Sequence, residues 1–209
     1  MQKRNRKNKI FLALCLIVPL LIFSIISFII YDEFKDSYIT KEEDYKLEIF
    51  FQELEDSKES TSNTDNTVKE NESLKTENYI SVIEIPKISL KRGIYSKDSK
   101  LNDVDKNIEI LKESDYPDID GGNFILAGHS GSGRTAYFKD LDKLELEDTI
   151  NIYYKGYKYI YGIKNIYEID KTGKAKIVRN KGITTLTLIT CKDGTDKQIV
   201  IIAELLGKA

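Results

Sequence analysis

Thr184-Thr185-Leu186-Thr187-Leu188-Ile189-Thr190-Cys191 is a run of β-branched and apolar residues that ends in a cysteine. This composition predicts a buried strand, and the turn-rich segment 192–196 separates it from a second apolar run at 198–205. Working outward, further strand-like runs lie at 79–85, 88–95, 123–127, 149–154 and 158–169. Helical turns are expected only near 101–105 and 136–144. Seven or eight short strands with so little helix predict an all-β barrel or sandwich.

The N-terminal segment has a different composition. Residues 2–9 hold five basic side chains, and residues 10–31 follow without a single charge. Twenty-two helical residues are long enough to cross a hydrocarbon core of roughly 30 Å. We therefore expect a cytoplasmic tail at 1–9, a transmembrane signal anchor at 10–31 and export of the remainder, by the positive-inside rule. A cleaved signal peptide is the alternative, but its apolar region is normally shorter and no Ala-x-Ala-like site follows Ile30.

Residues 32–78 are acidic, with 15 acidic and 6 basic side chains and neither Gly nor Pro. The polar stretch 57–78 cannot bury a core and predicts a flexible linker. Leu47, Phe50, Phe51 and Leu54 fall at helical spacing, so 42–56 is expected to form a short amphipathic helix. Such a helix could lie on the membrane, pack on the folded domain or remain a marginal part of the stalk. The folded domain itself is predicted at 79–209.

Histidine and cysteine are so rare in this chain that each is a candidate catalytic residue. His129 is the single histidine of the chain, just after the run 123–127, and Cys191 is the single cysteine outside the anchor. Outside the cell Cys191 has no disulfide partner, so a free thiol there indicates a nucleophile, with His129 as its acid–base partner. The alternatives are a small buried cysteine and a structurally bonded histidine. The net charge of −2 provides no global basic field, which argues against a nucleic-acid partner.

The segment Thr187-Leu188-Ile189-Thr190-Cys191 resembles the TLxTC motif of sortases, the membrane-anchored cysteine transpeptidases of Gram-positive bacteria. Residues 83–88, Ala127-Gly128-His129 and 138–144 resemble further landmarks of that family, in the family's order. The resemblance implies an eight-stranded sortase-like β-barrel with one or two short helices. It also implies cleavage of an LPxTG-like motif in exported proteins through a Cys191 thioester, and transfer to an amine of a cell-wall precursor or a pilin. No cofactor or metal is implied.

One family feature is missing. Sortases place an arginine on the strand after the cysteine, and here that position falls on Gln198. A glutamine amide can donate to an oxyanion but lacks the charged guanidinium fork. Lys197, Arg134 or Arg179 could supply the charge instead, and Thr190 is expected either to help receive the acyl group or to serve as an ordinary strand residue. The alternatives in function are a weak or inactive sortase-like binding module and a hydrolytic cysteine peptidase. The acidic run 115–122 is expected to be a solvated turn. Counted from Asp118, the sixth position of a calcium loop is Asn123 and not Gly, and the twelfth is His129 and not Glu.

Overall fold

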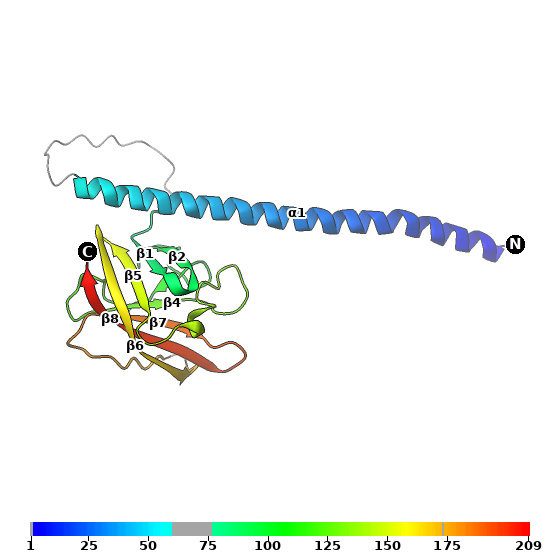
Figure 1. Ribbon diagram of the computed structural model, residues 1–209. Coiled ribbons are helices and arrows are strands. Elements are labelled where there is room, and N and C mark those ends of the chain that lie inside the picture. Colours follow the sequence, from blue (N-terminus) through cyan, green and yellow to red (C-terminus); the bar gives the residue numbers. More distant parts are fainter. Residues whose placement is uncertain (1, 60–76, 173) are drawn as a thin grey trace. The chain divides into compact units, whose positions relative to one another are not determined.

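The computed structural model describes residues 2–59, 77–172 and 174–209, which divide into two compact units, Met1–Tyr45 and Lys46–Ala209 (Figure 1). Helix α1 (Gln2–Glu59) provides all of the first unit and enters the second. It is continuous where the sequence predicted separate segments, because residues 32–59 contain no Gly or Pro to interrupt it. The linker predicted for residues 57–78 falls largely on 60–76, outside the described residues.

The predicted anchor at 10–31 lies within α1. Its large apolar side chains from Ile17 to Tyr31 are exposed, and the side chains of residues 10–16 are outside the described ones. Among the helices that the structure describes, none combines the length and hydropathy needed to span a bilayer. The single-pass topology therefore stays a prediction.

The second unit is built on one eight-stranded sheet that curls into a nearly closed barrel, as expected (Figure 1). The strand order is β2-β1-β5-β6-β8-β7-β4-β3. The strands are β1 (Ser81–Ile85), β2 (Leu90–Ile94), β3 (Glu109–Ile110), β4 (Asn123–Ala127), β5 (Thr149–Tyr154), β6 (Tyr157–Asp170), β7 (Thr185–Cys191) and β8 (Lys197–Lys208). The short helices are η2 (Pro86–Ile88) and η3 (Leu141–Lys143).

Seven of these strands coincide with predicted runs, and the helix η3 lies inside the segment 136–144. The helical turn expected at 101–105 was wrong, since this segment is an irregular turn. The Asp103 side chain accepts the amide N–H of Asp105, a local bond that competes with helix formation, and Asn102 is bound to the backbone of Ile110 in β3. Strand β3, with only two residues, had no recognisable pattern.

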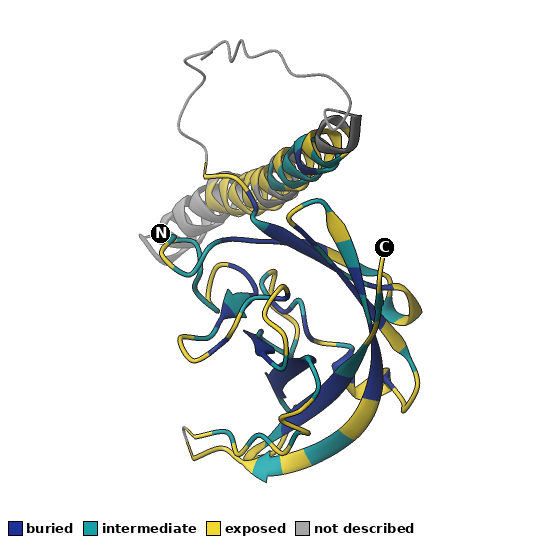
Figure 2. Ribbon diagram, turned by 90° about the vertical axis from the view of Figure 1, so that its left-hand side faces the viewer, coloured by how far each residue is buried: buried dark blue, intermediate teal, exposed yellow. Residues whose placement is uncertain are grey.

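Figure 2 shows that buried residues are concentrated on the strands of the barrel. The side chains of the main core alternate along β1, β4, β5, β6, β7 and β8. In β7, Leu186 and Leu188 point into the main core, whereas Ile189 belongs to a separate cluster on the outer face. That outer cluster contains the buried side chains Ile125, Ile189, Val200 and Ile202. Because Cys191 is two residues beyond Ile189, the alternation places it on the outer face as well.

The last turns of α1 pack on the barrel. Phe50 is buried with Tyr79, Val82 and Tyr95, and the ring of Phe51 lies edge-on to Tyr153 with 5.1 Å between centroids. Of the alternatives left open for the amphipathic helix at 42–56, packing on the folded domain is therefore the one observed for residues 47–54.

Candidate active site

The register of the parallel pair β4–β7 brings the histidine to the cysteine. Every residue of β4 pairs with the residue 62 positions later in β7, ending at Ala127 opposite Ile189. The Gly128 amide donates to the Ile189 carbonyl at 3.2 Å, which completes this last pair. His129 and Cys191 also differ by 62 and follow this pair by two residues each, so we infer that their side chains lie next to each other on the same face. Neighbouring strands lie about 4.8 Å apart, which makes these two residues neighbours.

The antiparallel pair β7–β8 adds a third residue to the same row. Cys191 is directly opposite Gln198, and directly opposed side chains in a sheet share one face. His129, Cys191 and Gln198 thus occupy adjacent positions across three strand ends, a set we call the active-site row. Gln198 and Cys191 are each partly exposed, so the row is open to solvent.

The alternative cations are engaged elsewhere or lie outside the row. Lys197 forms an ion pair with Asp170, and Arg179 donates to the backbone carbonyls of Gly121 and Ile183 at 3.0 and 3.4 Å. These bonds tie Arg179 to the start of β4 rather than to its end. Arg134 is an exposed residue of the turn that follows His129.

Thr190 lies on the opposite face from Cys191 and is only 3% exposed. Its hydroxyl donates to the Gly128 carbonyl at 2.8 Å. This bond joins the end of β7 to the end of β4, one residue before each member of the His129–Cys191 pair. The observed contact is therefore a structural one that fixes the two strand ends against each other.

His129 is held at both its backbone and its ring. Its carbonyl accepts the Phe138 amide at 3.0 Å, and its Nε2 lies 2.8 Å from Oδ1 of Asp105. The next residue, Ser130, donates its hydroxyl to Asp193 at 2.6 Å, which links the turns that follow the histidine and the cysteine. Neither Asp105 nor Asp193 was predicted from the sequence, because each lies in a turn with other acidic residues and no motif spacing sets it apart from them.

An apolar surface leads away from the row along the outer face. Residues partly buried against the outer cluster include Tyr167, Ile169, Ala175 and Ile177. The Tyr167 hydroxyl donates to the Lys176 carbonyl at 2.8 Å and accepts the Val178 amide at 2.9 Å. These bonds hold the segment that connects β6 to β7 beside the outer cluster.

Within the described ranges, no three His, Cys, Asp or Glu side chains gather closely enough to hold a metal ion. Two of the three carboxylates of the acidic run have protein partners. Asp118 pairs with Lys155 at 2.9 Å, and Asp115 accepts the Asn123 amide at 2.9 Å.

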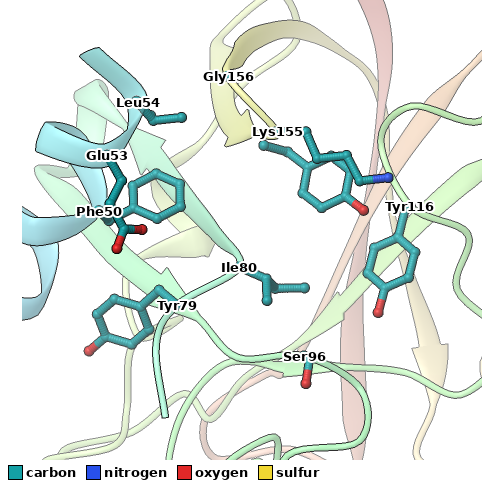
Figure 3. Close-up of a pocket in the computed structure, with 10 residues that line it drawn as sticks. Phe50, Glu53, Leu54, Tyr79, Ile80, Ser96, Tyr116, Lys155 and Gly156 are labelled. Atoms are coloured by element: carbon teal, nitrogen blue, oxygen red, sulfur yellow. The ribbon is translucent and has the colours of Figure 1, made fainter. Parts of the chain in front are cut away.

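A cavity of about 510 Å³ lies far from the row, beside the β5–β6 turn. Figure 3 shows Phe50, Glu53 and Leu54 of α1 on one side and Tyr116 and Lys155 on the other. Strand β6 starts beside this turn and ends opposite Lys197 and Gln198. Its 14 residues span roughly 45 Å at about 3.3 Å per residue, so this cavity is not part of the candidate active site.

Comparisons with known proteins agree on one family. A family model described as the sortase domain matches residues 83–206. Sortase A of Bacillus anthracis is 30% identical over 139 residues, which cover 66% of this chain and 64% of that protein; the chain thus spans less than two thirds of its length. The structure of the Clostridium perfringens sortase D5 transpeptidase is similar with a TM-score of 0.58 and 26% identity, covering 79% of this chain and 98% of that one. Sortase A of Corynebacterium diphtheriae shares the fold, with a TM-score of 0.53, 22% identity and coverage of 63% and 62%.

Proposed function

Because the chain belongs to the sortase family of transpeptidases, we propose that it cuts a peptide bond with Cys191 and passes the acyl group to an amine. Two observations support this assignment: the parallel strands β4 and β7 stay in register up to two residues before His129 and Cys191, and Cys191 pairs with Gln198. A thiol and an imidazole on neighbouring strand ends are the pair that thiol-dependent acyl transfer requires.

The chemistry follows from the roles these groups can take. His129 accepts the thiol proton, and the Cys191 sulfur attacks the carbonyl carbon of the scissile peptide bond. The tetrahedral intermediate collapses when His129 gives its proton to the leaving amine, which leaves a thioester on Cys191. An incoming amine then attacks the thioester carbon and loses a proton to His129. The bond between carbon and sulfur breaks, the new amide leaves, and the Cys191 sulfur takes the proton back from His129.

Gln198 is proposed to stabilise the negative charge that develops on the carbonyl oxygen. Its side-chain amide is a neutral donor in the position next to the sulfur, and one such donor can be worth about 3 kcal/mol in a transition state. A neutral donor cannot form the charged fork of an arginine. We therefore expect this enzyme to bind its transition state less tightly than a variant with a correctly placed guanidinium.

The proposed substrate is an LPxTG-like sorting motif of exported proteins, and the proposed acceptor is an amine of a peptidoglycan precursor or a pilin. The apolar outer surface supports a substrate that lies extended with alternate side chains against the protein. The exposed apolar side chains between Ile17 and Tyr31 support attachment to the cell membrane, with the barrel outside the cell. Fractionation of cells, followed by protease treatment of intact protoplasts, tests this location: the barrel should sediment with membranes and be digested from outside.

The decisive experiment uses the full 209-residue chain, purified with mild detergent under reducing conditions. We would incubate it with a pool of LPxTG-like peptides and hydroxylamine and identify the products by mass spectrometry. The proposal predicts a peptide hydroxamate that Cys191→Ala and His129→Ala abolish. The matched control is Cys15→Ala, which removes the other thiol of the chain and should leave the product unchanged.

Other outcomes would replace the proposal. Free acid in place of hydroxamate, at saturating hydroxylamine, would identify a hydrolytic cysteine peptidase. Peptide binding without turnover in the parent, together with product from Gln198→Arg, would identify a binding module that has lost catalysis.

A further inference from the structure

The geometry points to Asp105 as a positioning residue that orients the His129 ring, an inference that rests on the proposed function. Asp105 lies in the connection between β2 and β3, 24 positions before the histidine. Its Oδ1 is 2.8 Å from His129 Nε2, which is the length of a hydrogen bond between a ring N–H and a carboxylate. The His129 side chain is 42% exposed, so without a partner this ring could rotate freely.

The turn that carries Asp105 is fixed by its own hydrogen bonds. Asp103 accepts the Asp105 amide at 3.0 Å on its side chain, and its carbonyl accepts the amides of Lys106 and Asn107 at 2.9 and 2.8 Å. The pKa of Asp103 lies below its ordinary value because of the Asp105 amide bond and the paired Lys106, so Asp103 stays ionised near neutral pH. The turn therefore presents the Asp105 carboxylate from an ordered backbone.

Buried polar contacts anchor the same turn to the barrel on both sides. Asn107, which is 1% exposed, donates to the Gly93 carbonyl at 2.9 Å and accepts from Arg92 Nε at 2.9 Å. On the other side, Asn102 exchanges two bonds with the backbone of Ile110 at 2.7 and 3.0 Å. Displacement of the backbone of this turn away from His129 would therefore break contacts in the barrel wall.

The contact with Asp105 determines which ring nitrogen of His129 exchanges a proton with the Cys191 thiol. A carboxylate can only accept at neutral pH, so the Nε2 of His129 must be the donor in this contact. In the neutral ring the proton then stays on Nε2, and Nδ1 carries the lone pair that takes the proton of the Cys191 thiol. Nδ1 returns that proton to the leaving amine, while Asp105 keeps its negative charge throughout. A carboxylate that fixes a histidine tautomer in this way acts through the histidine and not on the substrate.

The experiment exploits the fact that His129 is the only histidine of the chain. We would label the full chain with 15N-histidine and record the imidazole nitrogens by NMR, for the parent and for Asp105→Ala, Asp105→Asn and Asp105→Glu. The parent should show a neutral ring protonated on Nε2. Asp105→Ala should move the Nδ1 and Nε2 shifts toward a mixture of tautomers. Asp98→Asn, which removes one exposed carboxylate from a neighbouring turn, is the matched control and should leave the spectrum unchanged.

Kinetics give the second measurement. Asp105→Ala should lower kcat for hydroxamate formation by about tenfold with little change in KM, a moderate effect because the carboxylate is 80% exposed and screened by water. Asp105→Glu, which retains an acceptor of the same charge, should recover part of the loss. An unchanged tautomer in Asp105→Ala overturns the inference, and so does an unchanged kcat with an altered tautomer. Because the NMR result does not depend on turnover, an inactive parent with an Nε2-protonated ring would refute the proposed function and leave the contact between Asp105 and the ring established.

Discussion

Replacing Thr190 by valine tests whether the active-site row depends on the bond between the ends of β7 and β4. Valine has nearly the shape of threonine but lacks the hydroxyl, so the Gly128 carbonyl loses the donor that lies 2.8 Å away. A buried polar group left without a partner costs about 1–3 kcal/mol, and Thr190 is 3% exposed. For a chain of this size that corresponds to a fall in Tm of roughly 2–12 °C, at about 2–4 °C per kcal/mol.

Thermal unfolding followed by far-UV circular dichroism measures the change in stability, and hydroxamate formation measures the change in kcat. Thr190→Ser keeps the hydroxyl and should retain most of the kcat, although it loses a methyl group. Thr149→Val makes the same chemical change at an exposed strand position and should alter stability by no more than about 0.5 kcal/mol. If Thr190→Val had the same Tm and the same kcat as the parent, the bond to Gly128 would have no part in aligning His129 with Cys191.

Three further changes test other contacts. Gly128→Ala should lower both stability and kcat, because a Cβ at this position would lie 2.8 Å from the Phe138 ring; overpacking of this kind costs about 1–3 kcal/mol, which urea unfolding would measure. Burial alone would raise the pKa of Glu84. Hydrogen bonds from Tyr153 and Asn151, both at 2.9 Å, and the positive charge of nearby lysines instead hold this pKa below its ordinary value of 4.5. The ionised Glu84 therefore stabilises the fold above about pH 4.5, and this stabilisation is lost as the pH falls through the lower pKa of the folded state. Glu84→Gln should cost about 1 kcal/mol of unfolding free energy at pH 7 and progressively less below pH 4, which urea titrations at several pH values would measure. Gln198→Ala should reduce kcat by about 10²-fold with a smaller change in KM, whereas an equal rate in both proteins would remove Gln198 from the proposed mechanism.

The sequence was most informative where strands consist of continuous β-branched and apolar residues. Runs such as 123–127 and 149–154 reappear with the predicted bounds because β-branched and apolar residues fit a half-buried pleated surface. Strand β3 could not be found, since its two residues gain their pairing from β4 and not from their own composition. The turn at 101–105 was misassigned because local side-chain bonds of Asn102 and Asp103 outweighed helix formation.

The candidate site also contains residues that the sequence predicted and a residue that it did not. The cysteine and the histidine stood out by their scarcity and by the resemblance to TLxTC, and strand register then placed Gln198 beside them. Asp105 could not have been predicted, because its role depends on how a turn from another part of the chain is anchored by Asn102 and Asn107. The neighbours of a residue in a strand can be predicted from the strand's periodicity, whereas the neighbours of a turn residue depend on the tertiary structure.

The 62-residue register between β4 and β7 also makes this protein a natural candidate for a two-piece reporter. The β5–β6 turn at Lys155 and Gly156, where both residues have positive φ, lies between His129 and Cys191 in the chain and far from them in space. Opening the peptide bond there would put the histidine on one polypeptide and the cysteine on the other. Under the proposed mechanism neither fragment alone could transfer an acyl group, so this activity would signal that two separately expressed halves, or two proteins fused to them, had come together.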